Sequence, residues 1–304
     1  MGRWFTEAFI LKKQNWIKWS VLAAAGLLVA AEVGLRWVGL VDFPVYDTDD
    51  QIGYIPAPSQ SGNFFNHNRW IVNSLSMGSG PWVPHGAHDV LLLGDSLVWG
   101  GNPLNQIDKL GPQLEARLSG RWLVWPASAG SWAVLNEVTY LDRHTDVVAD
   151  AEKIVWVLNT GDFIERTQWS SELTHPRSKP LSALVYAVQK YALPHLHLSE
   201  DVEAKVVQPV ILPESAAALK NKLATMDGRK VLIVLYPDRM ELATPTPHYL
   251  AFRTALKQAM AGCCQFLELR EEAEWKQPLY RDDIHPSAAG NRVLAEVLAK
   301  HLVH

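Results

Sequence analysis

Cysteine is nearly missing from this chain of 304 residues, which has only Cys263 and Cys264, side by side. Adjacent cysteines cannot join distant parts of a chain, and their spacing is not that of a metal site. The sequence therefore excludes a disulfide framework. We expect both cysteines to be small, half-buried residues at the start of a strand, with a vicinal disulfide as the alternative.

An excess of charge is also missing, because 28 Lys and Arg residues face 32 Asp and Glu residues and give a net charge of −4. Without a basic surface, nucleic acid is not an expected partner. The histidine pairs His85 with His88 and His195 with His197 lie in Pro-rich loops without a third ligand nearby. We therefore expect no metal site, and we expect no cofactor.

What is present is the composition of a globular protein, with 48% hydrophobic and 20% charged residues. The length suffices for one domain of about 200 residues with attachments. Thirteen tryptophans are many for such a chain. Some must lie in the core or at a membrane interface, and an excess of indoles also suits a sugar-binding surface.

The N-terminal segment Trp16 to Leu40 is mostly apolar, and its stretch from Trp19 to Ala31 has no charge. Its length suits a membrane-spanning helix. Basic residues precede the apolar stretch, namely Arg3, Lys12, Lys13 and Lys18. Acidic residues follow it, namely Asp42, Asp47, Asp49 and Asp50. This asymmetry predicts a cytoplasmic N-terminus and an exported remainder.

We therefore expect a single-pass anchor in the inner membrane and a periplasmic or extracellular domain. At the outer end of the anchor, Glu32 and Arg36 can pair at a spacing of four residues. Two alternatives stay open. Val29-Ala30-Ala31 could be the cleavage site of a removed signal peptide, and the segment could be a buried amphipathic helix.

Residues 41–88 are rich in Pro, Gly, Asn and Ser, a composition that favours loops with short strands. We interpret them as a packed connector without catalytic residues. The sequence thus divides into an N-terminal anchor (1–40), an irregular lead-in (41–88) and a main domain (89–304).

Apolar strands alternate with amphipathic segments throughout the main domain. The expected strands are Asp89–Leu93, Trp122–Trp125, Lys153–Leu158, Lys230–Tyr236 and Gln265–Leu269. The expected helices are Leu104–Leu118, Trp132–Arg143, Glu214–Met226, His248–Met260 and Ser287–Leu302. This alternation predicts an α/β fold with a parallel sheet covered on both faces. The excess segment 163–212, in which Pro180–Tyr191 could be a helix, is expected to shape a substrate site.

One apolar strand ends in Gly94, Asp95 and Ser96, which places a serine on the turn at the carboxyl edge of the sheet. A serine hydroxyl needs a base to become a nucleophile. Near the end of the chain, Asp282 stands three residues before His285, a spacing at which a carboxylate can orient an imidazole.

These two blocks together resemble the SGNH/GDSL hydrolases, over roughly residues 89 to 302. The resemblance implies a three-layer, flavodoxin-like fold with a five-stranded parallel sheet. It also implies that Ser96 is the nucleophile, His285 the base and Asp282 the acid, with Asp283 as the competing carboxylate. It implies an oxyanion hole made by the backbone N–H of Ser96, a glycine after the second strand and an asparagine after the third.

Gly130 is the candidate glycine of that hole, although a shift of one residue would select Ser131. The third block departs from the family's Gly-x-Asn-Asp pattern, because this chain has Asn159-Thr160-Gly161-Asp162. We expect Asn159 to reach the same space, with capping of the next turn as its competing role. Losing such a donor can lower the rate on the order of a hundredfold or more.

The resemblance implies a carboxylic ester hydrolase that works through an acyl-enzyme. An exported, anchored member could remove O-acetyl groups from a cell-surface or exopolysaccharide glycan, alongside polysaccharide-synthesis or export machinery. Two other functions stay open, namely an O-acyltransferase with the same three residues and a catalytically weakened binding module.

Overall fold

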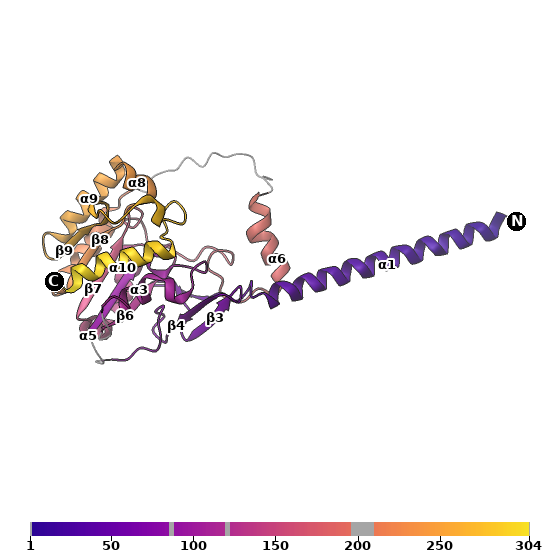
Figure 1. The fold of residues 1–304 in the computed structure, drawn as a ribbon, viewed down its shortest axis with the longest axis horizontal. Coiled ribbons are helices and arrows are strands. Elements are labelled where there is room, and N and C mark those ends of the chain that lie inside the picture. The colour runs from indigo at the N-terminus through magenta and orange to yellow at the C-terminus, as the bar shows by residue number, and fades with distance from the viewer. Residues whose placement is uncertain (1, 85–87, 119–121, 196–209, 304) are drawn as a thin grey trace.

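The computed structural model describes residues 2–84, 88–118, 122–195 and 210–303. The elements are α1 (Gly2–Trp37), β1 (Tyr46–Asp49), β2 (Gly53–Pro56), β3 (Gln60–Phe64), β4 (Asn68–Val72), β5 (His88–Gly94), α2 (Ser96–Trp99), α3 (Leu110–Glu115), β6 (Trp122–Ser128), α4 (Val134–Arg143), α5 (Thr145–Asp150), β7 (Lys153–Leu158), α6 (Ala183–Ala187), α7 (Pro213–Leu223), β8 (Val231–Leu235), α8 (Arg239–Ala243), α9 (Pro247–Met260), β9 (Gln265–Glu268) and α10 (Ala288–Val303). Figure 1 shows them as a rounded domain from which α1 projects.

The centre of the domain is a five-stranded sheet in the order β6-β5-β7-β8-β9. All of its strand pairs are parallel. This is the flavodoxin-like order, in which the chain starts near the middle and reverses direction between β5 and β7. The predicted α/β class and five-stranded parallel sheet are therefore confirmed. The order also brings the carboxyl ends of β5, β6 and β7 together at one edge.

Alternate strand residues bury opposite faces of this sheet. In β5, Leu91 and Leu93 belong to a core that includes buried residues of α4, α7 and α9. Their neighbours Val90 and Leu92 belong to a second core formed with α3 and α10. Because a strand points successive side chains to opposite faces, continuous apolar strands fit a sheet covered on both sides. The fold is thus the expected three-layer sandwich.

The lead-in forms two antiparallel hairpins, β1 with β2 and β3 with β4. Their aromatic residues, including Tyr54 and Trp70, are buried in the same core as α4, α7 and α9. The Trp70 indole N–H donates to the Asp42 carbonyl at 2.9 Å, which ties the second hairpin to the start of the lead-in. The short strands expected in this region are present, and their buried side chains pack into the core of the domain.

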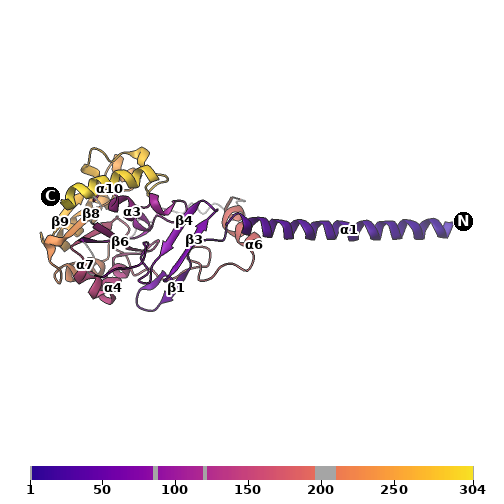
Figure 2. The ribbon, with the colours of Figure 1, turned by 60° about the horizontal axis from the view of Figure 1, so that its bottom comes forward.

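Helix α1 leaves the domain almost at once (Figures 1 and 2). Its part Trp16–Trp37 is long and apolar enough to cross a membrane, and none of that part's apolar window is buried. The alternative of a buried amphipathic helix is therefore wrong. Only the last residues of α1 contact the domain, where Glu32 accepts hydrogen bonds from the backbone N–H groups of Ala183 and Leu184.

Two local expectations need correction. The helix expected at Leu104–Leu118 is confined to α3, because Asn105 caps a separate 3₁₀ turn over Gln106–Asp108 and Lys109 then takes an extended conformation before α3 begins. Cys263 and Cys264 form a vicinal disulfide and are not free cysteines. The chain turns sharply there, since Ala261 ends α9 in the left-handed conformation just before the pair.

Candidate active site

Ser96 lies directly beyond β5, on a tight turn into the one-turn helix α2. The turn needs glycine at position 94, because a Cβ there would lie 2.6 Å from Val98 Cγ2. Asp95 caps α2, its carboxylate accepting the Leu97 N–H at 2.8 Å. Strand, glycine and cap together fix the serine at the carboxyl edge of the sheet, half-exposed to solvent.

His285 approaches Ser96 from the far end of the chain. Its Nε2 atom lies 2.9 Å from Ser96 Oγ, and its Nδ1 atom lies 2.9 Å and 3.0 Å from the two carboxylate oxygens of Asp282. The three side chains therefore form one hydrogen-bonded line. Asp283 takes no part in it; its carbonyl accepts the Arg239 N–H instead.

The loop that carries His285 is fixed by several hydrogen bonds. Asp282 Oδ1 accepts the N–H groups of Ile284 and His285. Tyr236, at the end of β8, donates its hydroxyl to the Ile284 carbonyl at 2.8 Å. Although partial burial opposes it, these N–H groups and the imidazole hold the pKa of Asp282 below its usual value, so the carboxylate is ionised at neutral pH.

Gly130 follows β6 and lies in the wall of the pocket that contains Ser96 and His285. Its carbonyl accepts hydrogen bonds from the Tyr54 hydroxyl at 2.5 Å and from His175 Nε2 at 3.0 Å. These two donors, from the lead-in and from the excess segment, fix the turn after β6. Ser131 takes a positive φ of 62° and is exposed.

Asn159 ends β7 but does not line this pocket. Its side-chain amide donates to Asp95 Oδ2 at 3.1 Å and to Asp162 Oδ1 at 3.2 Å, and its oxygen accepts the Gly161 N–H. The amide hydrogens are therefore occupied by two carboxylates. In this geometry, Asn159 is a bridge beneath the nucleophile and not a donor directed at the pocket.

That bridge belongs to a cluster of buried acids. Burial raises the pKa of Asp95 to about 6 and that of Glu137 to about 8, and it raises the pKa of Asp162 well above its usual value. Like-charge repulsion among the three carboxyls acts in the same direction. Protons are therefore retained within the cluster at neutral pH, a few atoms from the serine turn.

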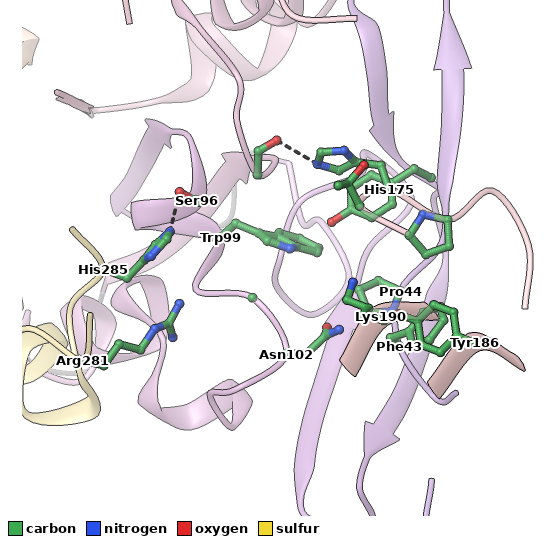
Figure 3. Close-up of a pocket in the computed structure, with 15 residues that line it drawn as sticks. Phe43, Pro44, Ser96, Trp99, Asn102, His175, Tyr186, Lys190, Arg281 and His285 are labelled. Atoms are coloured by element: carbon green, nitrogen blue, oxygen red, sulfur yellow. Dashed lines mark hydrogen bonds between the residues drawn. The ribbon is translucent and has the colours of Figure 1, made fainter. Parts of the chain in front are cut away.

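The pocket at this site has a volume of about 180 Å³. Figure 3 shows Ser96 and His285 on one side of it and His175, Tyr186 and Lys190 on the other, with Trp99 between. The lead-in, expected to be a packed connector without catalytic residues, supplies Phe43, Pro44 and Tyr46 to the wall of the pocket. The excess segment supplies His175, Pro176, Tyr186 and Lys190.

Several of these side chains were not anticipated from the sequence. Arg281 lines the pocket, donates to the Gly100 carbonyl and lies 3.6 Å from Asp282. Trp99 is stacked under the Lys109 ammonium group, 4.9 Å from the ring centre. In the sequence, only closeness to the candidate triad could have pointed to these two residues. Arg281 directly precedes Asp282, and Trp99 follows Ser96 by three residues.

No group of three or more His, Cys, Asp or Glu side chains suited to a metal ion occurs among the residues that the structure describes. His85 and His197 lie outside those residues. His88 instead contacts Glu152 and stacks against Trp122.

Comparison with known proteins gives likeness at the level of structure. No family model matches the sequence, and no curated protein matches it. Solved structures that it resembles include a lipase/acylhydrolase from Enterococcus faecalis, with 9% identity, a TM-score of 0.45 and coverage of 71% of this chain and 95% of that one. Est24, a carbohydrate acetylesterase from Sinorhizobium meliloti, shows 15% identity, a TM-score of 0.42 and coverage of 71% and 98%.

An aryl esterase from M. smegmatis gives similar values, with 16% identity, a TM-score of 0.43 and coverage of 71% and 99%. These solved structures are described as a lipase/acylhydrolase, a carbohydrate acetylesterase and an aryl esterase. At such scores, the likeness does not assign an activity, which must come from the side chains of this chain.

Proposed function

We propose that this protein is a serine ester hydrolase in which Ser96, His285 and Asp282 form the catalytic triad. The observation that carries this proposal is the unbroken line of hydrogen bonds from Ser96 Oγ through the imidazole to the Asp282 carboxylate. An ionised Asp282 accepts a hydrogen bond from Nδ1–H and keeps the proton on that nitrogen, so Nε2 is left free to accept the serine proton.

In the proposed reaction, His285 Nε2 takes the Ser96 proton as Oγ attacks the carbonyl carbon of an ester. The tetrahedral intermediate collapses when the imidazolium gives that proton to the leaving alcohol, which leaves an acyl group on Ser96. A water molecule, deprotonated by His285, then attacks the acyl-enzyme. Its products are a carboxylic acid and the free serine, so the protein returns to its starting state.

The developing oxyanion requires hydrogen-bond donors. We assign this role to the backbone N–H groups of Ser96 and Gly130. The third donor expected from the sequence, Asn159, would have to release Asp95 or Asp162 before it could serve. A two-donor oxyanion hole is therefore the working assignment, and it implies a slower enzyme than one with three donors.

The substrate that we propose is an O-acetylated glycan. The small pocket volume suits a short acyl group. Asn102, Lys190 and Arg281 line the pocket and offer their polar ends to sugar hydroxyls (Figure 3). An O-acyltransferase would use the same triad and pass the acyl group to a sugar hydroxyl in place of water.

We also propose that α1 anchors the domain in the inner membrane, with its N-terminus in the cytoplasm and the triad outside. Exposure of the apolar part of α1 supports this placement, because such a surface is unfavourable in water. The basic residues before this part and the acidic residues after it favour the orientation.

Burst kinetics with p-nitrophenyl acetate test the assignment of the nucleophile. The full chain in detergent should release one equivalent of nitrophenol rapidly, and mass spectrometry should find an acetyl group on Ser96. Ser96→Ala should abolish both signals, whereas Ser74→Ala, at an exposed serine that does not line the pocket, should keep them. Equal release by the wild type and Ser96→Ala would refute the proposal.

A further inference from the structure

The segment from Leu181 to Leu193 presents apolar side chains in two directions. Ala183 and Tyr186 are buried in the domain core. The opposite side is exposed, and its apolar residues with their exposed fractions are Leu181 (102%), Val185 (54%), Val188 (42%), Tyr191 (43%) and Leu193 (44%). Monomeric proteins rarely leave such a continuous apolar surface in water.

A groove of about 740 Å³ runs along this segment. Its apolar lining residues are Leu173, Pro176, Pro180, Leu181, Val185 and Tyr186. Pro176 and Tyr186 also line the pocket of Ser96 and His285, so the groove and the reaction pocket share a wall.

The end of α1 sets the position of this groove. Glu32 accepts hydrogen bonds from Ser182 Oγ and from the N–H groups of Ala183 and Leu184 at 2.8 to 2.9 Å. Arg36 donates to the Pro180 and Leu181 carbonyls. Figures 1 and 2 show α6 directly beside the end of α1 and running across its axis.

We propose that this groove binds the hydrocarbon chain of a membrane lipid. The inference rests on the membrane placement of α1 proposed above. If α1 spans the bilayer, a helix running across its outer end lies along the membrane surface, with its apolar side toward the acyl chains. Lys179 and Arg36 lie beside the groove and can meet anionic headgroups.

The shared wall gives this site a role in substrate choice. A lipid chain in the groove would hold the group attached to it at the mouth of the reaction pocket. With a lipid chain in the groove, the proposed substrate is an ester on a glycan that is attached to a membrane lipid. A glycan free in solution would not use the groove.

Site-specific photocrosslinking tests the occupant of the groove. The full chain, with p-benzoylphenylalanine at Val185, would be reconstituted in vesicles of phosphatidylethanolamine and phosphatidylglycerol and irradiated. A second probe at Leu181, which also lines the groove and is fully exposed, guards against a local defect at Val185. The control is the same substitution at Leu250, which is 45% exposed. It belongs to α9, a helix that lies at the opposite end of the domain from α1 (Figure 1).

We expect lipid adducts at positions 181 and 185 at several times the yield at position 250. Three outcomes would overturn the inference: crosslinks to a second copy of the chain, crosslinks within the chain to residues 196–209, or lipid yields equal to that at position 250. Vesicle flotation of the same samples separates this result from a failure of the anchor. Because Ser96→Ala should give the same adducts, a lack of esterase activity would not be confused with an empty groove.

Discussion

The imidazole of His285 is engaged at both of its nitrogens, which makes the partner at Nδ1 decisive for the tautomer. Replacing that partner by Asp282→Asn should leave the fold intact and lower kcat/KM by about 10⁴-fold, because an amide can hold the ring with the proton on the wrong nitrogen. The measurement is the steady-state hydrolysis of p-nitrophenyl acetate, with circular dichroism as the check on folding.

Asp283→Asn is the matched control, since it makes the same change one residue away. The backbone carbonyl of Asp283 accepts the Arg239 N–H at 2.8 Å, a contact that a side-chain substitution leaves in place. We expect its kcat/KM to stay within about twofold of wild type, as for most exposed substitutions. If Asp283→Asn were the crippling change, the triad would have to be redrawn around that residue.

Candidate residues of the site could be chosen from the sequence where they belong to a short motif. They could not be chosen where tertiary contacts determine the position of the side chain. Ser96, His285 and Asp282 were chosen from two short blocks, and the structure brings their side chains together. For Asn159 the block gives only the residue type. The direction of its side-chain amide is set by two carboxylates, one from the same block (Asp162) and one from a distant part of the chain (Asp95). Arg281 and His175 line the pocket through chain folding alone, which no local pattern records.

Helix α4 places a carboxyl group against the sheet, where it must carry a proton. Glu137 is completely buried, and one of its oxygens accepts the Trp156 indole N–H at 2.6 Å. Burial raises its pKa from 4.5 to about 8, while that hydrogen bond acts in the opposite direction. The folded state therefore binds this proton more tightly than the unfolded chain does.

This difference predicts how stability depends on pH. The stabilisation from the bound proton is complete below about pH 4.5 and is lost as the pH rises toward 8, so the wild-type Tm should fall over that range. Glu137→Gln has no proton to lose, and its Tm should fall less. Thermal unfolding from pH 5 to pH 8 is the measurement, and Glu214→Gln, at an exposed carboxyl, is the control. Parallel curves for wild type and Glu137→Gln would contradict this account.

Helix α6 is capped by a residue of another helix, an arrangement that a local sequence pattern does not reveal. The Glu32 side chain accepts the first N–H groups of α6 and the Ser182 hydroxyl. Losing a cap of this kind costs roughly 1 kcal/mol. Glu32→Ala should therefore speed amide exchange in Ala183–Ala187 about fivefold while leaving α4 and α9 unchanged.

Hydrogen exchange of the full chain in detergent measures this effect. Glu32→Gln keeps one acceptor oxygen and should show an intermediate rate, which distinguishes loss of the cap from a general loosening. An unchanged rate in Glu32→Ala would mean that packing and the Ser182 cap, whose hydroxyl oxygen accepts the Val185 N–H, hold α6 without Glu32.

At the level of elements, long apolar runs were the reliable signal. All five strands of the sheet appear near their expected positions, because a strand buried on both faces must be continuously apolar. Boundaries that depend on single turns were less predictable. The expected helix at Leu104–Leu118 is shortened by a 3₁₀ turn and the extended Lys109 after it, and α5 was not expected. The hairpins of the lead-in are fixed by tertiary packing of their aromatic residues.

The whole molecule has an asymmetric shape, with one exposed apolar helix projecting from a rounded domain (Figure 2). Glu32 and Arg36 connect that helix to the excess segment beside the reaction pocket. In the proposed orientation, α6 and its pocket residue Tyr186 would therefore lie beside the outer end of the membrane-spanning helix.

Reporter fusions test that orientation. Alkaline phosphatase, which is active only outside the cytoplasm, should be active when fused to the C-terminus and inactive when fused to the N-terminus. Green fluorescent protein should show the reverse, because it does not become fluorescent when exported unfolded. The physical reason is the charge asymmetry around α1, since Lys and Arg resist translocation. A C-terminal fusion active only in the cytoplasm would remove the exported glycan as a substrate, whereas the Ser96 assignment would still depend on the burst experiment.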